Sequence, residues 1–455
     1  MLNKIMVYSN IEGNRNSASN GEWEPITLIE LKAFIGLLLL GGLMGKSKKS
    51  IKSLWNRSPL ESPIFPATML RNRFETIISS IRFDNKTTRE ERKRTDKFAA
   101  FREIWTDFRE NLKKCYNPGL HVTLDEQFLG FRGKCPFRQY IPSKPDKYGI
   151  KFWFCVDVNS YYMFDAFPYI GRQPNEQRQR FVGANVVLEL MKPMYGSNRN
   201  VTIDNFFTSI PLAKELHSKE LTLVGTLGKN KPEIPIELQS NKNRDVGSSI
   251  FGFSDNLTLV SYVPKKNKAV LLLSSMHHDN KVDTGTGKPN IVLDYNKTKG
   301  AVDTIDEMCH KYSVKRGTRR WPLCVFYGII DAAAINAMIL WKKKNSNWNA
   351  NKKYKRRLFL EVLGTLLTSY LLDFRSKNSS TLHKDIQNAL ALFGYPRIET
   401  ELETFITDSA RSKRKRCSLC DYSSDRKVSN TCYKCSESVC KQHSVKRVFC
   451  INCSK

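Results

Sequence analysis

Residues 121–127 read His-Val-Thr-Leu-Asp-Glu-Gln, and residues 201–207 read Val-Thr-Ile-Asp-Asn-Phe-Phe. Each stretch is an apolar run typical of a buried strand, and each carries one isolated aspartate, Asp125 or Asp204. A carboxylate at a strand end lies at the rim of a sheet while its backbone stays anchored. The two runs therefore predict a sheet with acidic side chains gathered at one edge.

A third acidic segment, residues 298–307, reads Thr-Lys-Gly-Ala-Val-Asp-Thr-Ile-Asp-Glu and supplies Asp303 and Asp306. If this segment is helical, the two side chains share one face. Three converging carboxylates can hold two Mg²⁺ (or Mn²⁺) ions about 3.5–4 Å apart, which would activate an attacking hydroxyl and stabilise the leaving oxygen. Any one of these aspartates, taken alone, is better explained as a turn residue at the end of a strand. Taken together in a basic protein, they are explained equally well as turn residues or as metal ligands.

The rest of the chain alternates between helix and strand signals, which predicts a mixed α/β fold. Thr27 and Glu30 have the spacing of a capping box that begins a helix, and the polar first 20 or so residues are expected to be poorly ordered. Further helices are predicted at 69–81, 98–112, 181–191, 212–217, 299–312, 329–341 and 358–374. Strands are predicted at 151–158, 161–169, 200–203, 221–227, 257–263 and 269–275.

The composition predicts a polyanionic partner. The chain has 455 residues, with 74 Lys+Arg against 44 Asp+Glu and a net charge of +30. Apolar content of 40% excludes a disordered basic tail. The charge favours nucleic acid or an anionic membrane surface as the partner, and the run at 33–44 is shorter than the ~20 residues of a membrane span, so no membrane-spanning helix is expected.

The C-terminal cysteines have the spacing of metal ligands. Seven of the twelve lie in the last 40 residues; because seven is odd, they cannot all pair as disulfides, and His443 makes eight ligands. Alternating pairs predict a cross-brace around two structural zinc ions, against the simpler reading of buried free thiols. One ion would be held by Cys417, Cys420, Cys440 and His443, and the other by Cys432, Cys435, Cys450 and Cys453.

Basic residues outnumber acidic ones around this cluster, and the resulting positive charge favours contact with a phosphate backbone. Cross-braced fingers bind DNA, read histone tails or transfer ubiquitin, so a ubiquitin-ligase role stays open as well. The basic run at 411–416 is either a nuclear-import signal, which would place the protein in the nucleus, or a solvated linker.

Several long motifs resemble the piggyBac transposases. They are the segments at 123–138 and 140–151, Thr202-Ile-Asp-Asn-Phe-Phe-Thr-Ser-Ile-Pro-Leu-Ala, Tyr295-Asn-Lys-Thr-Lys-Gly-Ala-Val-Asp-Thr-Ile-Asp-Glu-Met, Arg320-Trp-Pro and the C-terminal cysteine array. The resemblance covers nearly the whole chain, in order. Two departures from the family are expected: its longer acidic N-terminal region is either missing or not included in this sequence, and Asn-Phe-Phe follows Asp204 where some relatives have Trp.

The resemblance implies a cut-and-paste DNA transposase that excises its element through hairpinned ends and joins it to TTAA sites in double-stranded DNA. Asp125, Asp204 and Asp303 match the catalytic triad, and Asp306 matches a further acidic position near the metals. A homodimer is implied as well, with no membrane as partner. The alternative is a domesticated, non-catalytic DNA-binding protein of the same fold.

The implied fold class is α/β, with a ribonuclease-H-like catalytic domain, a β-rich insertion, a flanking all-α dimerisation and DNA-binding domain, and a C-terminal cross-brace zinc finger. The predicted segments are 1–118 (helical domain, first part), 119–228 (catalytic domain, first part), 229–290 (β-rich insertion), 291–312 (catalytic domain, last part), 313–405 (helical domain, second part), 406–416 (basic linker) and 417–455 (zinc-binding domain).

Other residues have both a functional and a structural explanation. Five basic residues follow Asp125, and they are explained either as contacts to DNA phosphates or as a solvated loop: Arg132, Lys134, Arg138, Lys144 and Lys147. Arg319, Arg320 and Trp321 form either a DNA clamp or a core tryptophan with flanking charges. The His277-His278-Asp279 turn is expected at the surface. The other five cysteines are expected to be buried thiols: Cys115, Cys135, Cys155, Cys309 and Cys324.

Overall fold

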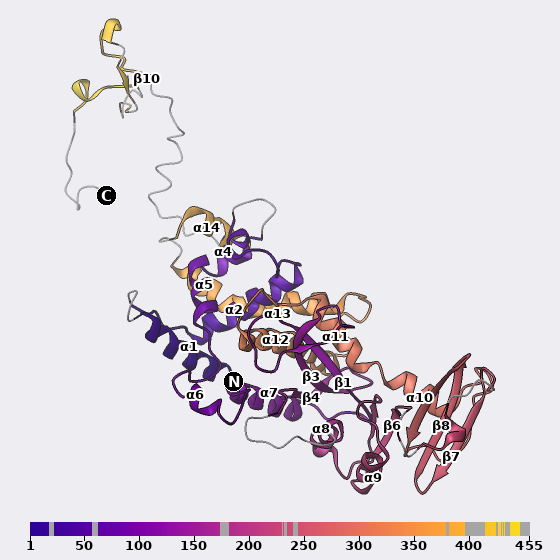
Figure 1. Ribbon diagram of the computed structural model, residues 1–455. Helices are drawn as coiled ribbons and strands as arrows, with labels where there is room; N and C mark the ends of the chain where they lie inside the picture. The colour runs from indigo at the N-terminus through magenta and orange to yellow at the C-terminus, as the bar shows by residue number, and fades with distance from the viewer. Residues whose placement is uncertain are drawn as a thin grey trace. The chain divides into compact units, whose positions relative to one another are not determined.

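The computed structural model divides the chain into two units, residues 1–375 and 376–455, each described here by itself (Figure 1). It describes residues 1–17, 22–56, 62–172, 182–229, 231, 234–239, 244–378, 382–395, 415–424, 426–428, 430, 432 and 437–445.

One mixed sheet forms the centre of the first unit. Its strands are β1 (His121–Gly130), β2 (Gln139–Tyr140), β3 (Tyr148–Asp157), β4 (Met163–Pro168), β5 (Asn200–Ile203), β6 (Thr222–Thr226), β7 (Ser249–Ser254), β8 (Leu257–Lys265) and β9 (Lys268–Ser274). The order is β2-β3-β1-β5-β6-β9-β8-β7, and β4 also pairs with β3. β1, β5 and β6 run parallel, and the other pairs are antiparallel. The mixed α/β prediction is confirmed.

The strands of the predicted insertion continue this sheet. β9 pairs with β6 through Val224, Gly225 and Thr226, so β7–β9 extend the sheet beyond β6. Strand β7 was not predicted from the sequence, because none of its residues is buried and it has no alternation of buried and exposed positions. The seven segment boundaries stay predictions.

Helices precede, interrupt and follow the sheet in sequence. They are α1 (Leu2–Ser17), α2 (Leu28–Leu43), α3 (Ile51–Leu54), α4 (Ile64–Thr68), α5 (Arg71–Ser80), α6 (Arg89–Arg92), α7 (Arg102–Cys115), α8 (Val182–Met191), α9 (Ile210–Ser218), α10 (Asn290–Thr298), α11 (Ala301–Lys311), α12 (Trp321–Lys344), α13 (Lys355–Lys377) and α14 (Lys384–Ala391). Helices α7 to α12 pack on the sheet, whereas α14 belongs to the second unit. The capping box of Thr27 and Glu30 begins α2 as predicted, with both reciprocal hydrogen bonds present.

For residues 1–17 the expectation of poor order was wrong, because polar side chains of α1 find partners in the folded protein, and residues 18–21 lie outside the described residues. Arg82 Nη2 lies 2.6 Å from Glu12 Oε1, and the Tyr8 hydroxyl donates to Glu103. Tertiary ion pairs of this kind leave no periodic signal in the sequence.

Helix α12 is the one described helix that is long and apolar enough to cross a membrane. It exceeds the run at 33–44 that the sequence analysis took as the longest. In the structure 78% of its most apolar window is buried, as in a core helix. It packs against β1 so closely that a Cβ on Gly328 would stand 2.8 Å from Leu129 Cδ1.

Candidate active site

Strand register brings the first two aspartates together. β1 and β5 are parallel neighbours in which Thr123 lies opposite Thr202. Asp125 and Asp204 each follow two residues later, so they occupy adjacent positions where the two strands run toward their carboxyl ends. Strands pair about 4.8 Å apart, so the two side chains are neighbours. Asp204 directly follows the end of β5 as expected, but Asp125 lies within β1, which continues to Gly130 in pairing with β3, so the expectation that it ends a strand was wrong.

Threonine hydroxyls attach the third acidic segment to the same two strands. Thr298, the last residue of α10, accepts from Thr123 Oγ1 through its carbonyl at 2.6 Å and from Thr202 Oγ1 through its own hydroxyl at 2.8 Å. The Thr298 hydroxyl also donates to the Asp294 carbonyl at 2.8 Å. Helix α11 begins three residues later, so this buried network fixes where its first turn, with Asp303, stands relative to the strands.

The electrostatics of Asp125 reflect this convergence. Burial is the main cause that raises its pKa, and the negative charges of Asp204 and Asp303 raise it further, to about 6 in all. Burial likewise raises the pKa of Asp204, against the Phe206 and Phe207 amides, which donate to its carboxylate. The charges of Asp204 and Asp303 thus act on the half-buried carboxylate of Asp125, while Asp303 itself is exposed.

Asp306 adjoins this group from the next turn of α11, on the same helix as Asp303, as predicted. Burial raises its pKa, while His310, Gln127 and Lys144 oppose the rise. Its Oδ1 is buried without a hydrogen-bond partner among the described residues. We refer to Asp125, Asp204, Asp303 and Asp306 as the acidic centre.

The residue types of the acidic centre suit divalent cations, because carboxylate oxygens are the ligands that Mg²⁺ and Mn²⁺ prefer. Burial and the charges of Asp204 and Asp303 raise the pKa of Asp125. Asp306 Oδ1 is buried without a hydrogen-bond partner among the described residues, with His310 Nδ1 3.6 Å away. Divalent ions, when bound, lower the pKa of a hydroxyl nucleophile and stabilise the leaving oxygen. The role of β1, β5 and α11 in this site is to position the carboxylates, whereas the ions would supply the chemistry.

Two further residues at the acidic centre escaped the sequence analysis. Burial raises the pKa of Tyr295, and the charges of all three aspartates of the predicted triad raise it too, so its phenol lies within their field. Glu126 forms ion pairs with Lys144 at 3.4 Å and with Lys151. Tyr295 precedes Thr298 by three residues in α10. In a helix this spacing puts both side chains on one face, so recognising α10 as a helix could have identified Tyr295 as a neighbour of the site.

The basic residues after Asp125 have mixed surroundings. Arg132, Lys134, Arg138 and Lys147 are exposed, whereas Lys144 is half-buried beside Glu126. Arg138 Nη1 donates to the carbonyls of Arg132 and Gly133 at 2.8 and 3.0 Å, which stabilises this loop. Their predicted contact with DNA stays a prediction.

The Arg319-Arg320-Trp321 segment has mainly structural contacts. Arg320 donates to three carbonyls at the end of α5 and beyond it, those of Ile78, Ser79 and Ile81. The Trp321 ring lies 5.3 Å from that of Phe98 and 5.0 Å from that of Phe137. Arg319 is exposed. The tryptophan therefore belongs to an aromatic core, one of the two explanations given above.

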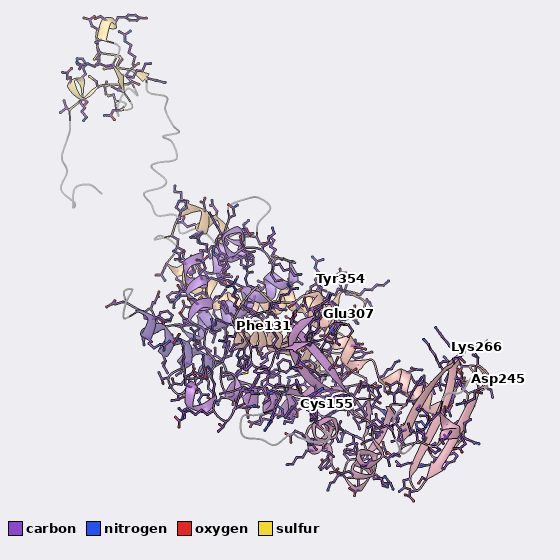
Figure 2. All side chains as sticks on the ribbon, viewed as in Figure 1. Phe131, Cys155, Asp245, Lys266, Glu307 and Tyr354 are labelled. Atoms are coloured by element: carbon purple, nitrogen blue, oxygen red, sulfur yellow. The ribbon has the colours of Figure 1, made fainter. Side chains whose placement is uncertain are left out.

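His277 is not the exposed turn residue that the sequence suggested. Its Nδ1 lies 2.8 Å from Ser274 Oγ, and its Nε2 lies 2.9 Å from Asp294 Oδ2. Of the five scattered cysteines, Cys155 (Figure 2), Cys309 and Cys324 are buried as expected, but Cys115 is exposed and Cys135 is intermediate. Cys115 ends α7 on its solvent side, which the apolar spacing of that helix does not reveal.

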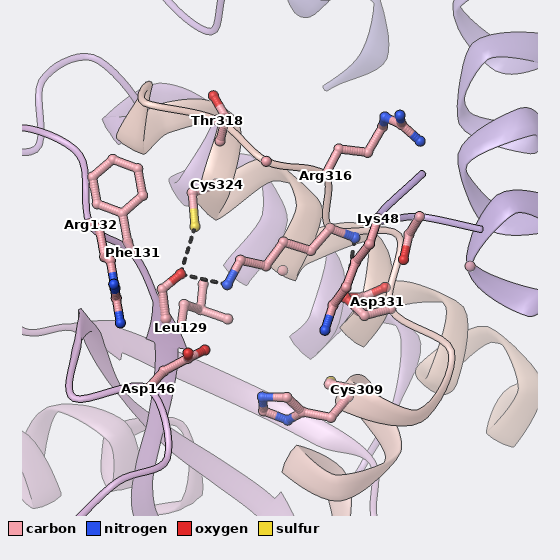
Figure 3. A pocket seen from close by; sticks show the side chains of 18 of the residues that line it. Lys48, Leu129, Phe131, Arg132, Asp146, Cys309, Arg316, Thr318, Cys324 and Asp331 are labelled. Atoms are coloured by element: carbon pink, nitrogen blue, oxygen red, sulfur yellow. Dashed lines mark hydrogen bonds between the residues drawn. The ribbon is translucent and has the colours of Figure 1, made fainter. Parts of the chain in front are cut away.

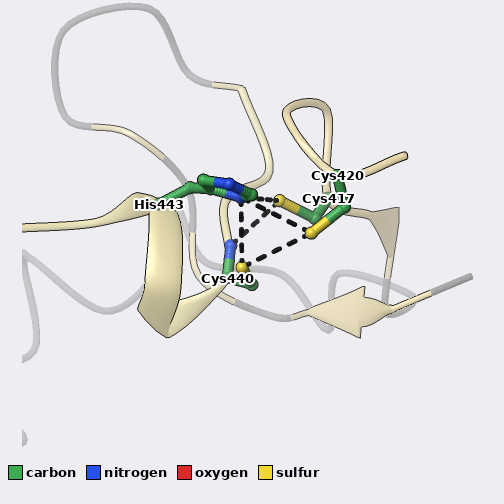
Figure 4. A group of neighbouring side chains, drawn as sticks. All are labelled: Cys417, Cys420, Cys440 and His443. Carbon is green, nitrogen blue, oxygen red and sulfur yellow. Dashed lines mark hydrogen bonds between the residues drawn. The ribbon is translucent and has the colours of Figure 1, made fainter. Parts of the chain in front are cut away.

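A second group of metal-type ligands lies in the second unit. Cys417, Cys420, Cys440 and His443, here called the C-terminal cluster, have ligand atoms within 4.8 Å of one another (Figure 4). Cys420 Sγ and Cys440 Sγ are 3.6 Å apart, and His443 Nδ1 lies 3.4 Å from each. Zn–S bonds of about 2.3 Å in a tetrahedron give S···S edges of about 3.8 Å, so one zinc ion fits.

One zinc site is therefore seen among the described residues, rather than the two predicted. Of the second ligand set, Cys435, Cys450 and Cys453 lie outside the described residues, so that prediction is not tested.

Comparison with known proteins agrees with this geometry. A family model described as "Transposase IS4" matches residues 1–338. The cryo-EM structure of the piggyBac transposase synaptic complex with hairpin DNA is 37% identical, with a TM-score of 0.81, over 99% of this chain and 94% of that one.

Two human relatives are similar at lower identity. PiggyBac transposable element-derived protein 3 is 25% identical over 80% of this chain, and PiggyBac transposable element-derived protein 2 is 25% identical over 72%. The chain covers 63% and 57% of the length of these relatives.

An α/β chain with carboxylates gathered at adjacent strands of a mixed sheet has the architecture of a DDE-type transposase. The chain belongs to the IS4 transposase family, and within that family to the piggyBac group.

Proposed function

We propose that this chain is a cut-and-paste DNA transposase that cleaves element ends and joins them to target DNA by two-metal phosphoryl transfer. The observation that carries the proposal is the acidic centre, where strand register and the threonine network bring Asp125, Asp204 and Asp303 into one field. Two divalent ions bound there would activate the attacking hydroxyl and stabilise the leaving oxygen.

The sheet supports a ribonuclease-H-like reading of the catalytic domain. In the order β4-β3-β1-β5-β6, the first two pairings are antiparallel and the last two are parallel. Helix α11, which follows α10 in sequence, adds the last carboxylate, Asp303. The helices before and after the sheet would form the dimerisation and DNA-binding domain of a homodimer.

The partner in this proposal is double-stranded DNA. The net charge of +30 favours a phosphate backbone, and the related cryo-EM structure is a complex with hairpin DNA. TTAA target sites, a nuclear location and a second zinc ion on Cys432, Cys435, Cys450 and Cys453 belong to the same proposal.

Excision of a donor element tests this proposal. With Mg²⁺, the purified chain should release an element that carries its own terminal repeats, and sequencing should show a restored donor junction. Asp303→Asn should abolish cleavage while leaving DNA binding intact. Asp245→Asn, an exposed aspartate of the β7–β9 region (Figure 2), is the matched control and should cleave normally. DNA binding without any cleavage by the natural sequence would instead support the domesticated, non-catalytic role.

A further inference from the structure

A cavity of about 600 Å³ lies beside the acidic centre in the first unit (Figure 3). Gln127, two residues after Asp125 on β1, lines it, and so does His310, one turn after Asp306 on α11. From Asp125 to Leu129, which also lines the cavity, β1 rises about 14 Å, or about four base-pair steps of DNA. The cavity is therefore within reach of a strand that passes the acidic centre.

The lining of this cavity is strongly basic. Its five lysines and arginines face two aspartates: Lys48, Arg132, Lys311, Lys315 and Arg316 against Asp146 and Asp331. Among the described residues, none of the five cations forms an ion pair with a carboxylate. Figure 3 shows Lys48, Arg316 and Asp331 on one side and Phe131 and Arg132 on the other.

Arg316 is the most informative of these cations because it is only 9% exposed. Its guanidinium donates to the Lys49 carbonyl at 2.5 Å, and the neighbouring Lys315 ammonium donates to the Gly130 carbonyl at 2.5 Å. Each head group keeps further N–H donors, and a buried charge without a counter-ion is costly. The arrangement is suited to an anion.

The nearby carboxylate of Asp331 does not serve as that counter-ion. Its two oxygens accept from the Ser313 hydroxyl at 2.7 Å and the Val314 amide at 2.9 Å. Asp331 is 7% exposed, and it holds the 313–314 turn in place from within α12.

The opposite wall is apolar and aromatic. Leu129, Phe131 and Tyr148 line it, and Tyr148 is 41% exposed. Gly317 supplies space, since a Cβ there would meet nothing within 4 Å. Lys48 and Arg316 face a wall of apolar and aromatic side chains, beside which Arg132 also lies, and this pairing of cations with an apolar wall matches the phosphate and the base of a nucleotide. The volume of the cavity suits a single nucleotide and is too small for a duplex.

We propose that this cavity binds one unpaired nucleotide of a DNA strand, its phosphate on Lys315 and Arg316 and its base against Leu129, Phe131 and Tyr148. The inference rests on the proposed function, because it assigns a place to DNA near the acidic centre.

The test compares two short duplexes of the same sequence, one fully paired and one with a single unpaired thymidine. Binding to the full chain is measured by fluorescence anisotropy at fixed salt. The natural sequence should bind the unpaired probe about tenfold more tightly, the effect of stacking one base. Gly317→Phe fills the cavity and should bind both probes equally. Gly285→Phe, at an exposed turn outside the cavity, should keep the tenfold preference.

A second variant guards against misfolding of Gly317→Phe. Lys48→Ala with Lys311→Ala removes two exposed lining cations and should reduce the preference several-fold while the circular dichroism spectrum stays unchanged. The proposal is overturned if Gly317→Phe keeps the tenfold preference, or if the natural sequence binds the paired duplex and shows no preference. Free thymidine 5′-monophosphate that displaces the unpaired probe at an equal concentration would overturn the assignment to a DNA strand. A chain that binds neither duplex would instead refute the proposed function.

Discussion

The acidic centre and the C-terminal cluster are both groups of metal-type ligands, but the chain positions them differently. The acidic centre is held by paired strands and by the hydroxyls of Thr123, Thr202 and Thr298, which are all at most 9% exposed. Around the C-terminal cluster, the described elements are strands and 3-10 turns of two or three residues.

This difference implies different roles for the metals. Under the proposed function, the fold sets the positions of the acidic centre, so ions bound there would serve chemistry and their removal should leave the fold intact. Among the described residues around the C-terminal cluster the elements are only two or three residues long, so a bound ion would supply much of the folding free energy. The predictions below separate these two cases.

The largest effect is expected from Asp204→Asn at the acidic centre. It removes a metal ligand without changing the shape of the side chain, so cleavage should fall by about 10³-fold or more, while the melting temperature stays constant or rises. Activity assays and calorimetry on the same preparation measure both. A melting temperature that drops together with activity would show that this carboxylate supports the fold.

Cys440→Ser should have the opposite profile at the C-terminal cluster. It removes a thiolate that lies 3.4 Å from His443 Nδ1 and 3.6 Å from Cys420 Sγ. We expect zinc affinity to fall by at least about 100-fold, and amide protection within 415–445 to disappear while that of 1–375 remains. Hydrogen exchange with mass spectrometry measures this. Protection that persists in the zinc-free variant would contradict the role given to the metal.

Thr298→Val tests how the fold positions α11. The variant keeps the Thr298 carbonyl that accepts from Thr123, but it leaves the buried Thr202 hydroxyl without its partner at 2.8 Å. The free energy of unfolding should fall by about 1–3 kcal/mol, and cleavage should fall because Asp303 shifts. Thr286→Val, at an exposed hydroxyl that donates to Asp283, is the matched control and should change stability by less than about 0.5 kcal/mol.

Asp331, which lies outside the acidic centre, shows how burial raises the pKa of a carboxylate and makes stability depend on pH. Burial is the main cause that raises its pKa from 3.8 to about 7, against the hydrogen bonds from Val314 and Ser313. Because the folded state holds the proton more tightly, its contribution to stability is complete below pH 3.8 and is lost as pH rises through about 7. Relative to Asp331→Asn, the natural sequence should lose up to about 1.4 kcal/mol per pH unit across this window.

Denaturant unfolding at several pH values checks this slope. Identical slopes for both chains would mean that Asp331 titrates normally in the folded state.

The candidate residues of the acidic centre could be selected from the sequence because their signals are local, and their role as metal ligands stays a prediction. Asp125 and Asp204 follow short apolar runs, and Thr27 with Glu30 has the spacing of the capping box that begins α2, so short windows carry the information. Thr298 and Tyr295 could not be assigned in this way, because their roles depend on the pairing of β1 with β5. Contacts between residues far apart in the sequence also explain why the order of α1 and the pairing of β9 with β6 were not predicted. The ion pair of Glu12 in α1, for example, is with Arg82.

The central claim is that the fold holds two divalent ions on Asp125, Asp204 and Asp303. The most direct measurement is Mn²⁺ binding to the full chain, followed by electron paramagnetic resonance. We predict a spin-coupled signal from two ions about 3.5–4 Å apart, lost in Asp303→Asn and unchanged in Asp245→Asn. An uncoupled signal, or a coupled signal that persists in Asp303→Asn, would contradict it.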